Sequence, residues 1–221
     1  MIKSVIFDMD GVLVDSEAAI TVAAIEALRS WNIDAKESDF KPFTGMGEDR
    51  FIGGVAEKYG LVYEKSMKDK AYEIYLETAG ERVKVYPESK IVLNKLKELA
   101  LPFALASAAD KIKVECNLDC IGIDPKAFAA IVTGSDVVKK KPDPEIFLTA
   151  AHEAGFSPKS CLVVEDALSG VQAAKSAGML CLALTTSFDK NSLLNAGADF
   201  VSDNLGELLN IVERRKGNEH K

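Results

Sequence analysis

Four carboxylates follow two short apolar runs of the sequence. Asp8 and Asp10 come after SVIF in the segment FDMDGV, and Glu165 and Asp166 come after CLVV in VVEDALSG. Residues two apart in an extended segment point the same way, so Asp8 and Asp10 can address one pocket, with Gly11 allowing a tight turn. Crowded carboxylates repel one another unless a cation lies among them, and an all-oxygen ligand set suits Mg²⁺. The pattern therefore predicts an acidic pocket that holds magnesium.

Two further polar residues follow apolar runs in the same way. Ser107 comes after LPFALA, and Lys141 lies a few residues after AAIVT in the segment VVKKKPDPEIF. Pro142 favours an extended conformation for the residue before it, which makes Lys141 the best placed of three consecutive lysines to turn inward. Its ammonium group would give an otherwise acidic protein a local positive site for a negatively charged ligand.

Each of these residues also has a purely structural interpretation. Asp10 could only begin a turn, and Ser107 could only cap the helix that follows it. Lys141 could belong to a solvated basic loop, and Asp166 or Ser169 could cap the next helix. These interpretations do not explain why every strand end carries a reactive residue type.

The apolar runs themselves are continuous rather than alternating, as in strands buried on both faces of a parallel sheet. They cover 4–7, 102–106, 129–133, 161–164, 180–184 and 198–201, and helix-like stretches at 88–99, 145–154 and 169–177 lie between them. Strands alternating with helices predict an α/β fold with a doubly wound, Rossmann-like parallel sheet. Ligands of such sheets bind beyond the carboxyl ends of the strands, so the polar residues would converge on one rim if the first four runs are neighbours.

Residues 16–83 have no comparable apolar run, and their apolar positions follow helical periods. The helices expected there cover 19–28, 50–59 and 65–78. The expected division is an α/β core of residues 1–14 and 86–221 and a helical cap domain of residues 15–85. Linkers near 14–17 and 83–87 would let the cap open for a ligand and close to exclude water.

Composition excludes several classes of protein. With 221 residues, of which 48% are hydrophobic and 28% are charged, the chain can build a packed core. The formal charge of −7 argues against binding of nucleic acid or of an anionic membrane. The chain has only two histidines, so its chemistry is expected from carboxylates rather than from a multi-histidine metal site.

The cysteine spacing and the lack of a long apolar segment indicate the cellular compartment of the protein. Cys116, Cys120, Cys161 and Cys181 form no C-x-x-C pair, and we expect free thiols that are buried as small apolar side chains. The apolar run near the N-terminus is far too short for a signal peptide or a membrane span. The sequence therefore predicts a cytoplasmic protein, and we expect a monomer or a weak dimer.

The four polar positions, in this order and at this spacing, resemble the motifs of the haloacid dehalogenase-like hydrolases. The matching segments are DMDGV at 8–12 with its continuation LVDSE, Ser107, Lys141 within KPDPEIF, and Glu165-Asp166 within VEDALSGVQAA. The similarity covers the whole chain and is greatest to the β-phosphoglucomutase-like and phosphoglycolate-phosphatase-like members, which carry a helical cap after the first motif. It implies an enzyme that acts on phosphate esters, with an α/β core and an inserted cap.

This resemblance also implies roles for the carboxylates. Asp8 would be the nucleophile that forms an aspartyl-phosphate, and Asp10 would be the general acid and base. Mg²⁺ would be held by Asp8, by the backbone carbonyl of Asp10 and by Asp166. Glu165 would support the metal directly or through water.

Ligand-binding residues implied by the resemblance lie around this centre. Lys141 would neutralise phosphoryl charge, and Ser107, with the amides after Asp8, would bind the phosphoryl oxygens. Substrate contacts are further expected from the hinge, from the cap and from the loop after the second strand. The expected substrate-binding set is Ser16, Gly45, Glu48, Arg50, Ser107 and Ala108.

The cap departs from the β-phosphoglucomutase pattern. Ile20 occupies the position where those enzymes tend to have a histidine. Glu48 stands in the cap loop TGMGEDRF where their phosphate-gripping arginine would be expected. Arg50 could replace that arginine or could be a surface residue. The departures favour a Mg²⁺-dependent phosphatase that acts on a small phosphorylated metabolite.

Two other functions stay open. One is a phosphomutase of the β-phosphoglucomutase type that acts on a hexose phosphate. The other is a non-catalytic phospholigand sensor, although receiver-like modules of that kind are shorter and lack the inserted cap. Residues 43–55 and the segment ADKIKVECNL look more similar to a phosphatase-like domain that also occurs fused within plant chloroplast proteins.

Overall fold

Six parallel strands form one sheet, in the order β5-β4-β1-β6-β7-β8, in a computed structural model that describes residues 1–44 and 46–217. The strands are β1 (Ser4–Phe7), β4 (Phe103–Ala106), β5 (Ile131–Val132), β6 (Cys161–Glu165), β7 (Leu180–Leu184) and β8 (Phe200–Ser202). β1 lies inside the sheet, with Phe7 opposite Leu105 of β4 and Val164 of β6. The predicted doubly wound α/β fold is confirmed, and a strand is present at each predicted run.

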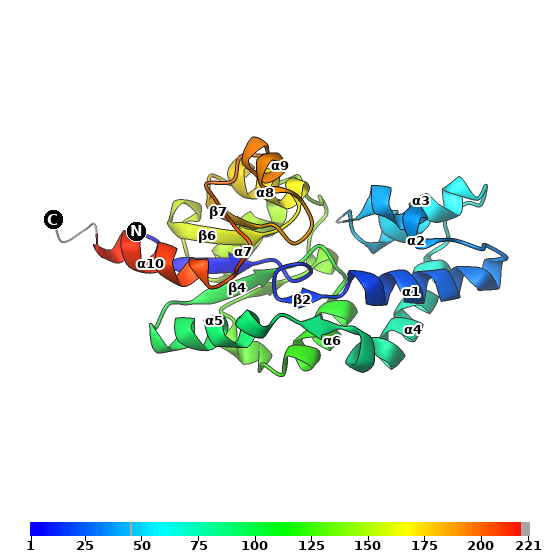
Figure 1. The fold of residues 1–221 in the computed structure, drawn as a ribbon, viewed down its shortest axis with the longest axis horizontal. Helices are drawn as coiled ribbons and strands as arrows, with labels where there is room; N and C mark the ends of the chain where they lie inside the picture. Colours follow the sequence, from blue (N-terminus) through cyan, green and yellow to red (C-terminus); the bar gives the residue numbers. More distant parts are fainter. Residues whose placement is uncertain (45, 218–221) are drawn as a thin grey trace.

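Helices cover both faces of this sheet (Figure 1). One face is covered by α5 (Pro87–Glu98), α6 (Lys111–Ile121) and α10 (Glu207–Gly217). The other is covered by α7 (Glu145–Glu153), α8 (Leu168–Ser176) and α9 (Lys190–Asn195). Successive side chains of β1 alternate between the two resulting cores, since Val5 and Phe7 pack into the first and Ile6 into the second. Burial on both faces explains why the strands are continuous apolar runs.

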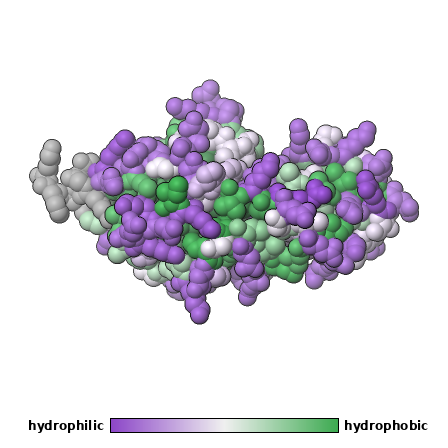
Figure 2. Space-filling view, turned by 60° about the horizontal axis from the view of Figure 1, so that its bottom comes forward, coloured by the Kyte–Doolittle hydropathy of each residue, from purple (hydrophilic) through white to green (hydrophobic). Residues whose placement is uncertain are grey.

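A helical lobe with its own apolar core follows β1 in the chain (Figure 1). Its helices are α1 (Glu17–Leu28), α2 (Glu37–Phe40), α3 (Glu48–Lys58) and α4 (Lys65–Arg82). A short antiparallel ribbon of β2 (Val14–Asp15) and β3 (Lys84–Val85) joins this lobe to the sheet, at both predicted linkers. Hydrophilic side chains cover most of the visible surface of both lobes (Figure 2). We call the helical lobe the cap, and its extent of 15–85 as a mobile domain remains a proposal.

Short 3-10 helices complete the regular structure of the described chain. They are η1 (Arg29–Trp31), η2 (Lys41–Phe43), η3 (Pro125–Ala127), η4 (Gly134–Asp136) and η5 (Pro158–Ser160).

The cap packs on the core chiefly through α4 and α6. The Tyr75 hydroxyl of α4 donates a hydrogen bond to Asn117 Oδ1 of α6 at 2.5 Å, and both side chains are buried. Lys68 Nζ, also on α4, lies 2.7 Å from a carboxylate oxygen of Asp110, the residue just before α6. These contacts fix the position of the cap over one end of the sheet.

The four cysteines are free thiols, as the sequence predicts. Cys161 and Cys181 are buried in the core, in agreement with the prediction. Cys116 and Cys120 are only half-buried, on the side of α6 that meets the cap. The expectation that all four are fully buried is therefore wrong for this pair.

Replacement of Tyr75 by phenylalanine should lower the free energy of unfolding by about 1–3 kcal/mol, because the buried oxygen of Asn117 loses its donor. Urea denaturation measures this loss. Tyr63→Phe is the matched control, since the Tyr63 hydroxyl bonds the exposed carboxylate of Asp49 and its loss should be cheaper. Equal losses for both variants would contradict a structural role for the contact between α4 and α6.

Candidate active site

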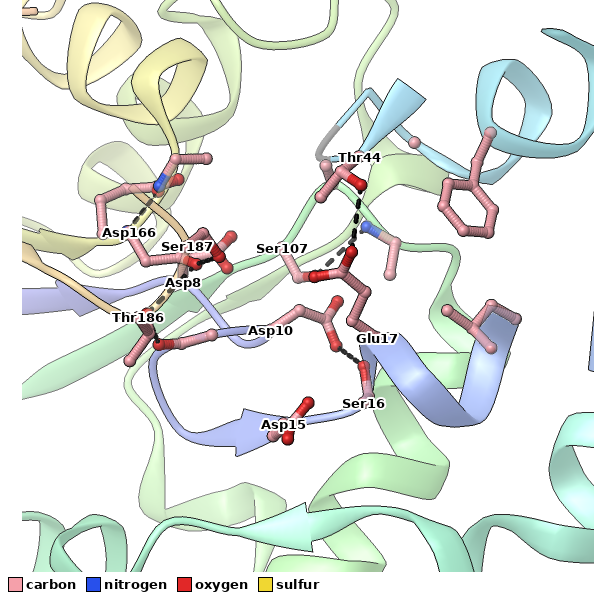
Figure 3. A pocket seen from close by; sticks show the side chains of 18 of the residues that line it. Asp8, Asp10, Asp15, Ser16, Glu17, Thr44, Ser107, Asp166, Thr186 and Ser187 are labelled. Carbon is pink, nitrogen blue, oxygen red and sulfur yellow. Dashed lines mark hydrogen bonds between the residues drawn. The ribbon is translucent and has the colours of Figure 1, made fainter. Parts of the chain in front are cut away.

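A cavity of about 220 Å³ lies where the carboxyl ends of β1, β4, β6 and β7 face the cap (Figure 3). Residues at the strand ends line one side of it, and residues of α1 and α3 line the other. Its charged lining residues are Asp8, Asp10, Asp15, Glu17, Glu48, Lys113, Lys141, Glu165 and Asp166. Ser16, Ser107, Thr186 and Ser187 add hydroxyl groups. The parallel sheet thus brings residues from distant parts of the chain to one rim.

Lys141 connects two of the strand ends. Its Nζ lies 2.5 Å from Asp8 Oδ1 and 2.6 Å from Glu165 Oε1, and all three side chains are buried. Burial alone would lower the pKa of Lys141, but the two carboxylates outweigh burial and hold this pKa above its ordinary value. Of the three consecutive lysines, the one before Pro142 is the one that turns inward, while the ammonium of Lys140 bonds the Gly134 carbonyl.

Glu165 is fixed from two sides. One of its oxygens bonds Lys141, and the other accepts hydrogen bonds from the amides of Asp166 and Ala167, both at 2.7 Å. The carboxylate also fills the space beside Gly170, where a Cβ atom would lie 1.7 Å from Glu165 Oε1. A residue with a side chain at Gly170 would therefore displace Glu165.

The N-terminus of α8 is not capped by the side chains that the sequence suggests. The helix begins at Leu168 with Ala167 as the N-cap residue, and neither Asp166 nor Ser169 provides a side-chain cap. That structural interpretation is wrong for Asp166 because its carboxylate is turned to the hydroxyls of Thr186 and Ser187 instead of to the helix amides. Asp166 is left free to face the cavity.

Asp166 is oriented by residues that sequence analysis did not single out. Its Oδ2 accepts hydrogen bonds from the hydroxyls of Thr186 and Ser187, in the loop after β7. Gly11 has a positive φ of +78°, and a Cβ there would lie 1.9 Å from the same oxygen. Thr186 and Ser187 follow an apolar run just as the predicted site residues do, and this signal could have identified them.

Asp10 turns away from Asp8 toward the cap (Figure 3). Its Oδ1 accepts hydrogen bonds from the Ser16 hydroxyl and from Asn117 Nδ2, the latter at 3.2 Å, and its Oδ2 lies 3.0 Å from Lys113 Nζ. Lys113 is buried, and its Nζ also lies 3.1 Å from Glu48 Oε1 of the cap. No sequence signal distinguishes Lys113 and Asn117, because an ordinary amphipathic helix accounts for both.

Ser107 and Ala108 lie beside Asp8 in the loop after β4. Ser107 is almost fully buried, and its hydroxyl oxygen accepts a hydrogen bond from the amide of Ala109 at 3.2 Å. The helix that follows has Asp110 as its N-cap residue, so Ser107 is not a helix cap. Its hydroxyl proton is therefore available to a ligand in the cavity.

The predicted cap contacts divide into three groups. Ser16 and Glu48 line the cavity. Arg50 does not belong to the described lining residues, because its guanidinium pairs with Glu57 at 2.7 Å and lies over the Phe43 ring. The structure thus supports Arg50 as a surface residue rather than as a replacement for the phosphate-gripping arginine. Gly45 lies outside the described residues.

Burial and like charge raise the pKa of two carboxyl groups of the site. Burial raises the pKa of Asp8 to about 7, since Glu165 and Asp10 add to the effect and Lys141 offsets it only in part. Burial also raises the pKa of Asp166 well above its ordinary value, together with the charges of Glu165 and Asp8. Both carboxyls would gain from a nearby cation.

The donor set fits a divalent cation. Asp8, Glu165 and Asp166 lie at the strand ends with the Lys141 ammonium group, which leaves two negative charges there without a counter-charge. Mg²⁺ takes one or two carboxylates and completes its shell with carbonyl and water oxygens, a set that Asp8, Asp166 and the Asp10 carbonyl can supply. Over the described residues, no group of three or more Asp, Glu, His or Cys side chains is arranged around one metal position. The fit is therefore to a site with two carboxylates, not to a larger cage.

The family follows from comparison with known proteins. A family model described as haloacid dehalogenase-like hydrolase matches residues 2–178. The chain therefore belongs to the haloacid dehalogenase-like hydrolases, as the motifs predict. The structure of a β-phosphoglucomutase from Clostridium difficile superposes with a TM-score of 0.83, covering 100% of this chain and 99% of that one, at 24% identity. At that identity the likeness shows the fold alone.

Relatives of known name include phosphatases. A phosphoglycolate phosphatase of Vibrio cholerae is 30% identical over 220 residues, which are 96% of this chain and 97% of that protein. The chloroplastic protein SUPPRESSOR OF QUENCHING 1 of Arabidopsis thaliana is 38% identical over 217 residues, which are 94% of this chain and 20% of that protein. The present chain thus spans about a fifth of that plant relative. Family and relatives together make this chain an enzyme of the phosphatase type. None of its described helices is long and apolar enough to cross a membrane.

Mg²⁺ should raise the melting temperature more at pH 8 than at pH 5. The folded-state pKa of Asp8, about 7, lies above the ordinary value of 3.8, so the stability that this group contributes is complete below pH 3.8 and is lost as the pH rises toward 7. At pH 8 the charged carboxyls repel, and a bound cation relieves the repulsion. Thermal unfolding with and without Mg²⁺ at both pH values measures a shift of several degrees.

Two variants make this measurement specific. Asp8→Asn should reduce the Mg²⁺ effect strongly, because it removes one of the two carboxylates, whereas Asp34→Asn, at an exposed position, should retain it. Equal stabilisation at pH 5 and pH 8 would contradict a cation site built on these carboxyls.

Proposed function

We propose that this chain is a Mg²⁺-dependent phosphatase that hydrolyses a small phosphorylated metabolite through an aspartyl-phosphate on Asp8. The observation that supports this most is the placement of Asp8. Its carboxylate lies at the cavity, is buried, and bonds Lys141, and Asp10 follows two residues later. This arrangement provides a nucleophile, a cation for phosphoryl charge and a second carboxyl for proton transfer.

The chemistry divides among the residues of the cavity. Bound Mg²⁺ would supply positive charge to the phosphoryl oxygens. An oxygen of Asp8 attacks phosphorus, so an oxygen–phosphorus bond forms and the bond to the leaving oxygen breaks. Lys141 and the Ser107 hydroxyl bind the phosphoryl oxygens during this step.

Asp10 handles the protons of both steps. It protonates the leaving oxygen in the first step, and its carboxylate then takes a proton from the water that attacks the aspartyl-phosphate. The second step releases phosphate and restores Asp8. The contacts of Asp10 with Ser16, at the first linker, and with Lys113 of α6 place it between core and cap. Closure of the cap would bring it to the leaving group and exclude bulk water.

The cap side of the cavity favours hydrolysis over a phosphomutase reaction. A phosphomutase must also hold the second phosphate of a bisphosphate intermediate, and a free cation opposite Asp8 would favour this. Glu48 occupies the cap position that lines the cavity, Lys113 is paired with it, and Arg50 is paired with Glu57. None of these groups offers an unpaired positive charge to a second phosphate.

Asp8→Asn should reduce hydrolysis of p-nitrophenyl phosphate in the presence of Mg²⁺ by more than about 10³-fold, because the amide is not a nucleophile. The variant should remain folded, since the substitution removes a buried charge. Asp34→Asn is the control and should keep the wild-type rate. Wild-type turnover by folded Asp8→Asn would rule out the proposed mechanism.

Asp10→Asn should separate the two steps. p-Nitrophenolate leaves without protonation, so Asp8 should still be phosphorylated, whereas hydrolysis of the phosphoenzyme should become slow. The expected result is a burst of p-nitrophenolate equal to the enzyme concentration, with one phosphoryl group on the Asp8 peptide by mass spectrometry. Steady turnover with no burst and no phosphorylated peptide would contradict this assignment.

A further inference from the structure

We propose that the charge of the cavity selects the substrate: a monophosphate ester whose leaving group is hydroxylated and carries no second anionic group. This inference rests on the proposed phosphatase function and adds the class of leaving group. It follows from the way positive and negative charges are distributed between the two sides of the cavity.

The side of the cavity at the strand ends is suited to one phosphate. Asp8, Glu165 and Asp166 lie there with Lys141. A divalent cation would balance the two negative charges that remain, so the phosphoryl group enters a region without excess negative charge.

The side of the cavity that faces the cap has more negative than positive charges. Asp10, Asp15, Glu17 and Glu48 line it, and Lys113 is the only basic residue there among the described lining residues. Lys113 Nζ lies 3.0 Å from Asp10 and 3.1 Å from Glu48, so the single positive charge of this lysine faces two carboxylates. Lys113 therefore leaves no excess positive charge for an anionic group of a ligand.

Among the described residues, no cation neutralises Asp15 or Glu17. Glu17 accepts a hydrogen bond from the Thr44 hydroxyl at 3.2 Å, and neither acid forms an ion pair within the part of the chain that the structure describes. Figure 3 shows Glu17, at the start of α1, beside Thr44, and Asp15 next to Ser16. Their carboxylates can accept hydrogen bonds from substrate hydroxyls and would repel a carboxylate or a second phosphate.

The rest of the lining agrees with a small leaving group. Ile20, Phe51 and Phe188 provide apolar surface for carbon atoms. The cavity of about 220 Å³ is smaller than the ~300–1,000 Å³ of ordinary ligand pockets. A phosphate and a few hydroxylated carbons would fill it.

The test compares three substrates of similar size that differ in the charge of the leaving group. They are 2-hydroxyethyl phosphate, which is neutral, phosphoethanolamine, which is cationic, and 2-phosphoglycolate, which is anionic. With the wild-type protein and Mg²⁺, kcat/KM should be at least about tenfold higher for the neutral and the cationic compound than for 2-phosphoglycolate.

Variants that remove one negative charge each test whether Glu48 and Glu17 cause the selection against anionic leaving groups. Glu48→Gln and Glu17→Gln should each lower the ratio of kcat/KM for 2-hydroxyethyl phosphate to that for 2-phosphoglycolate by at least about threefold. A ratio is used because any general loss of activity cancels in it. Glu26→Gln, an exposed position on the same helix as Glu17, should leave the ratio unchanged.

The outcomes distinguish this inference from the proposed function. Hydrolysis of p-nitrophenyl phosphate together with equal or better hydrolysis of 2-phosphoglycolate would overturn charge selection and leave the phosphatase intact. So would a ratio that does not change in both Glu48→Gln and Glu17→Gln. Failure to hydrolyse any of the four compounds would overturn both proposals.

Discussion

Lys141 holds two buried carboxylates that would otherwise repel each other. Asp8 follows β1 and Glu165 ends β6, so the two short contacts of one ammonium group tie neighbouring strands to the loop after β5. Loss of the cation from such a cluster leaves uncompensated buried charge, which costs far more than the net contribution of the ion pairs. The other polar groups at this rim donate hydrogen bonds to the buried carboxylates and so reduce the free-energy cost of burying their charge.

Each of the other carboxylates has its own means of stabilisation. Backbone amides at the start of α8 bind Glu165, and hydroxyls of the β7 loop bind Asp166. Asp10 is held from the cap side, through Ser16, Lys113 and Asn117. Because Asn117 also accepts from Tyr75 of α4, a continuous chain of hydrogen bonds runs from the cap to the carboxyl that we assign to proton transfer. The position of the cap and the orientation of Asp10 therefore share one set of contacts.

The predictable part of the fold is the part governed by burial. Strands β1, β6 and β7 coincide closely with continuous apolar runs, because both of their faces are covered by helices. β5 spans only Ile131–Val132 of a longer predicted run, since it lies at the sheet edge and pairs with β4 alone. The predicted helix cap at Asp166 failed because hydroxyls of the loop after β7, from Thr186 and Ser187, bind its carboxylate. A local sequence pattern could not reveal these contacts, because about 20 residues of chain separate the partners.

The sequence alone determined the fold class and the residue types that meet at the rim. Apolar runs specify burial, and in a parallel sheet the chain direction puts the residues after each strand at the same end. Only the tertiary structure decided how the charges pair. Lys113 meets Asp10 and Glu48 across 103 and 65 residues of chain, and Arg50 turns outward to Glu57. The pairing of Lys113 with Glu48 depends on how the cap packs against α6, a geometry that no local sequence pattern specifies.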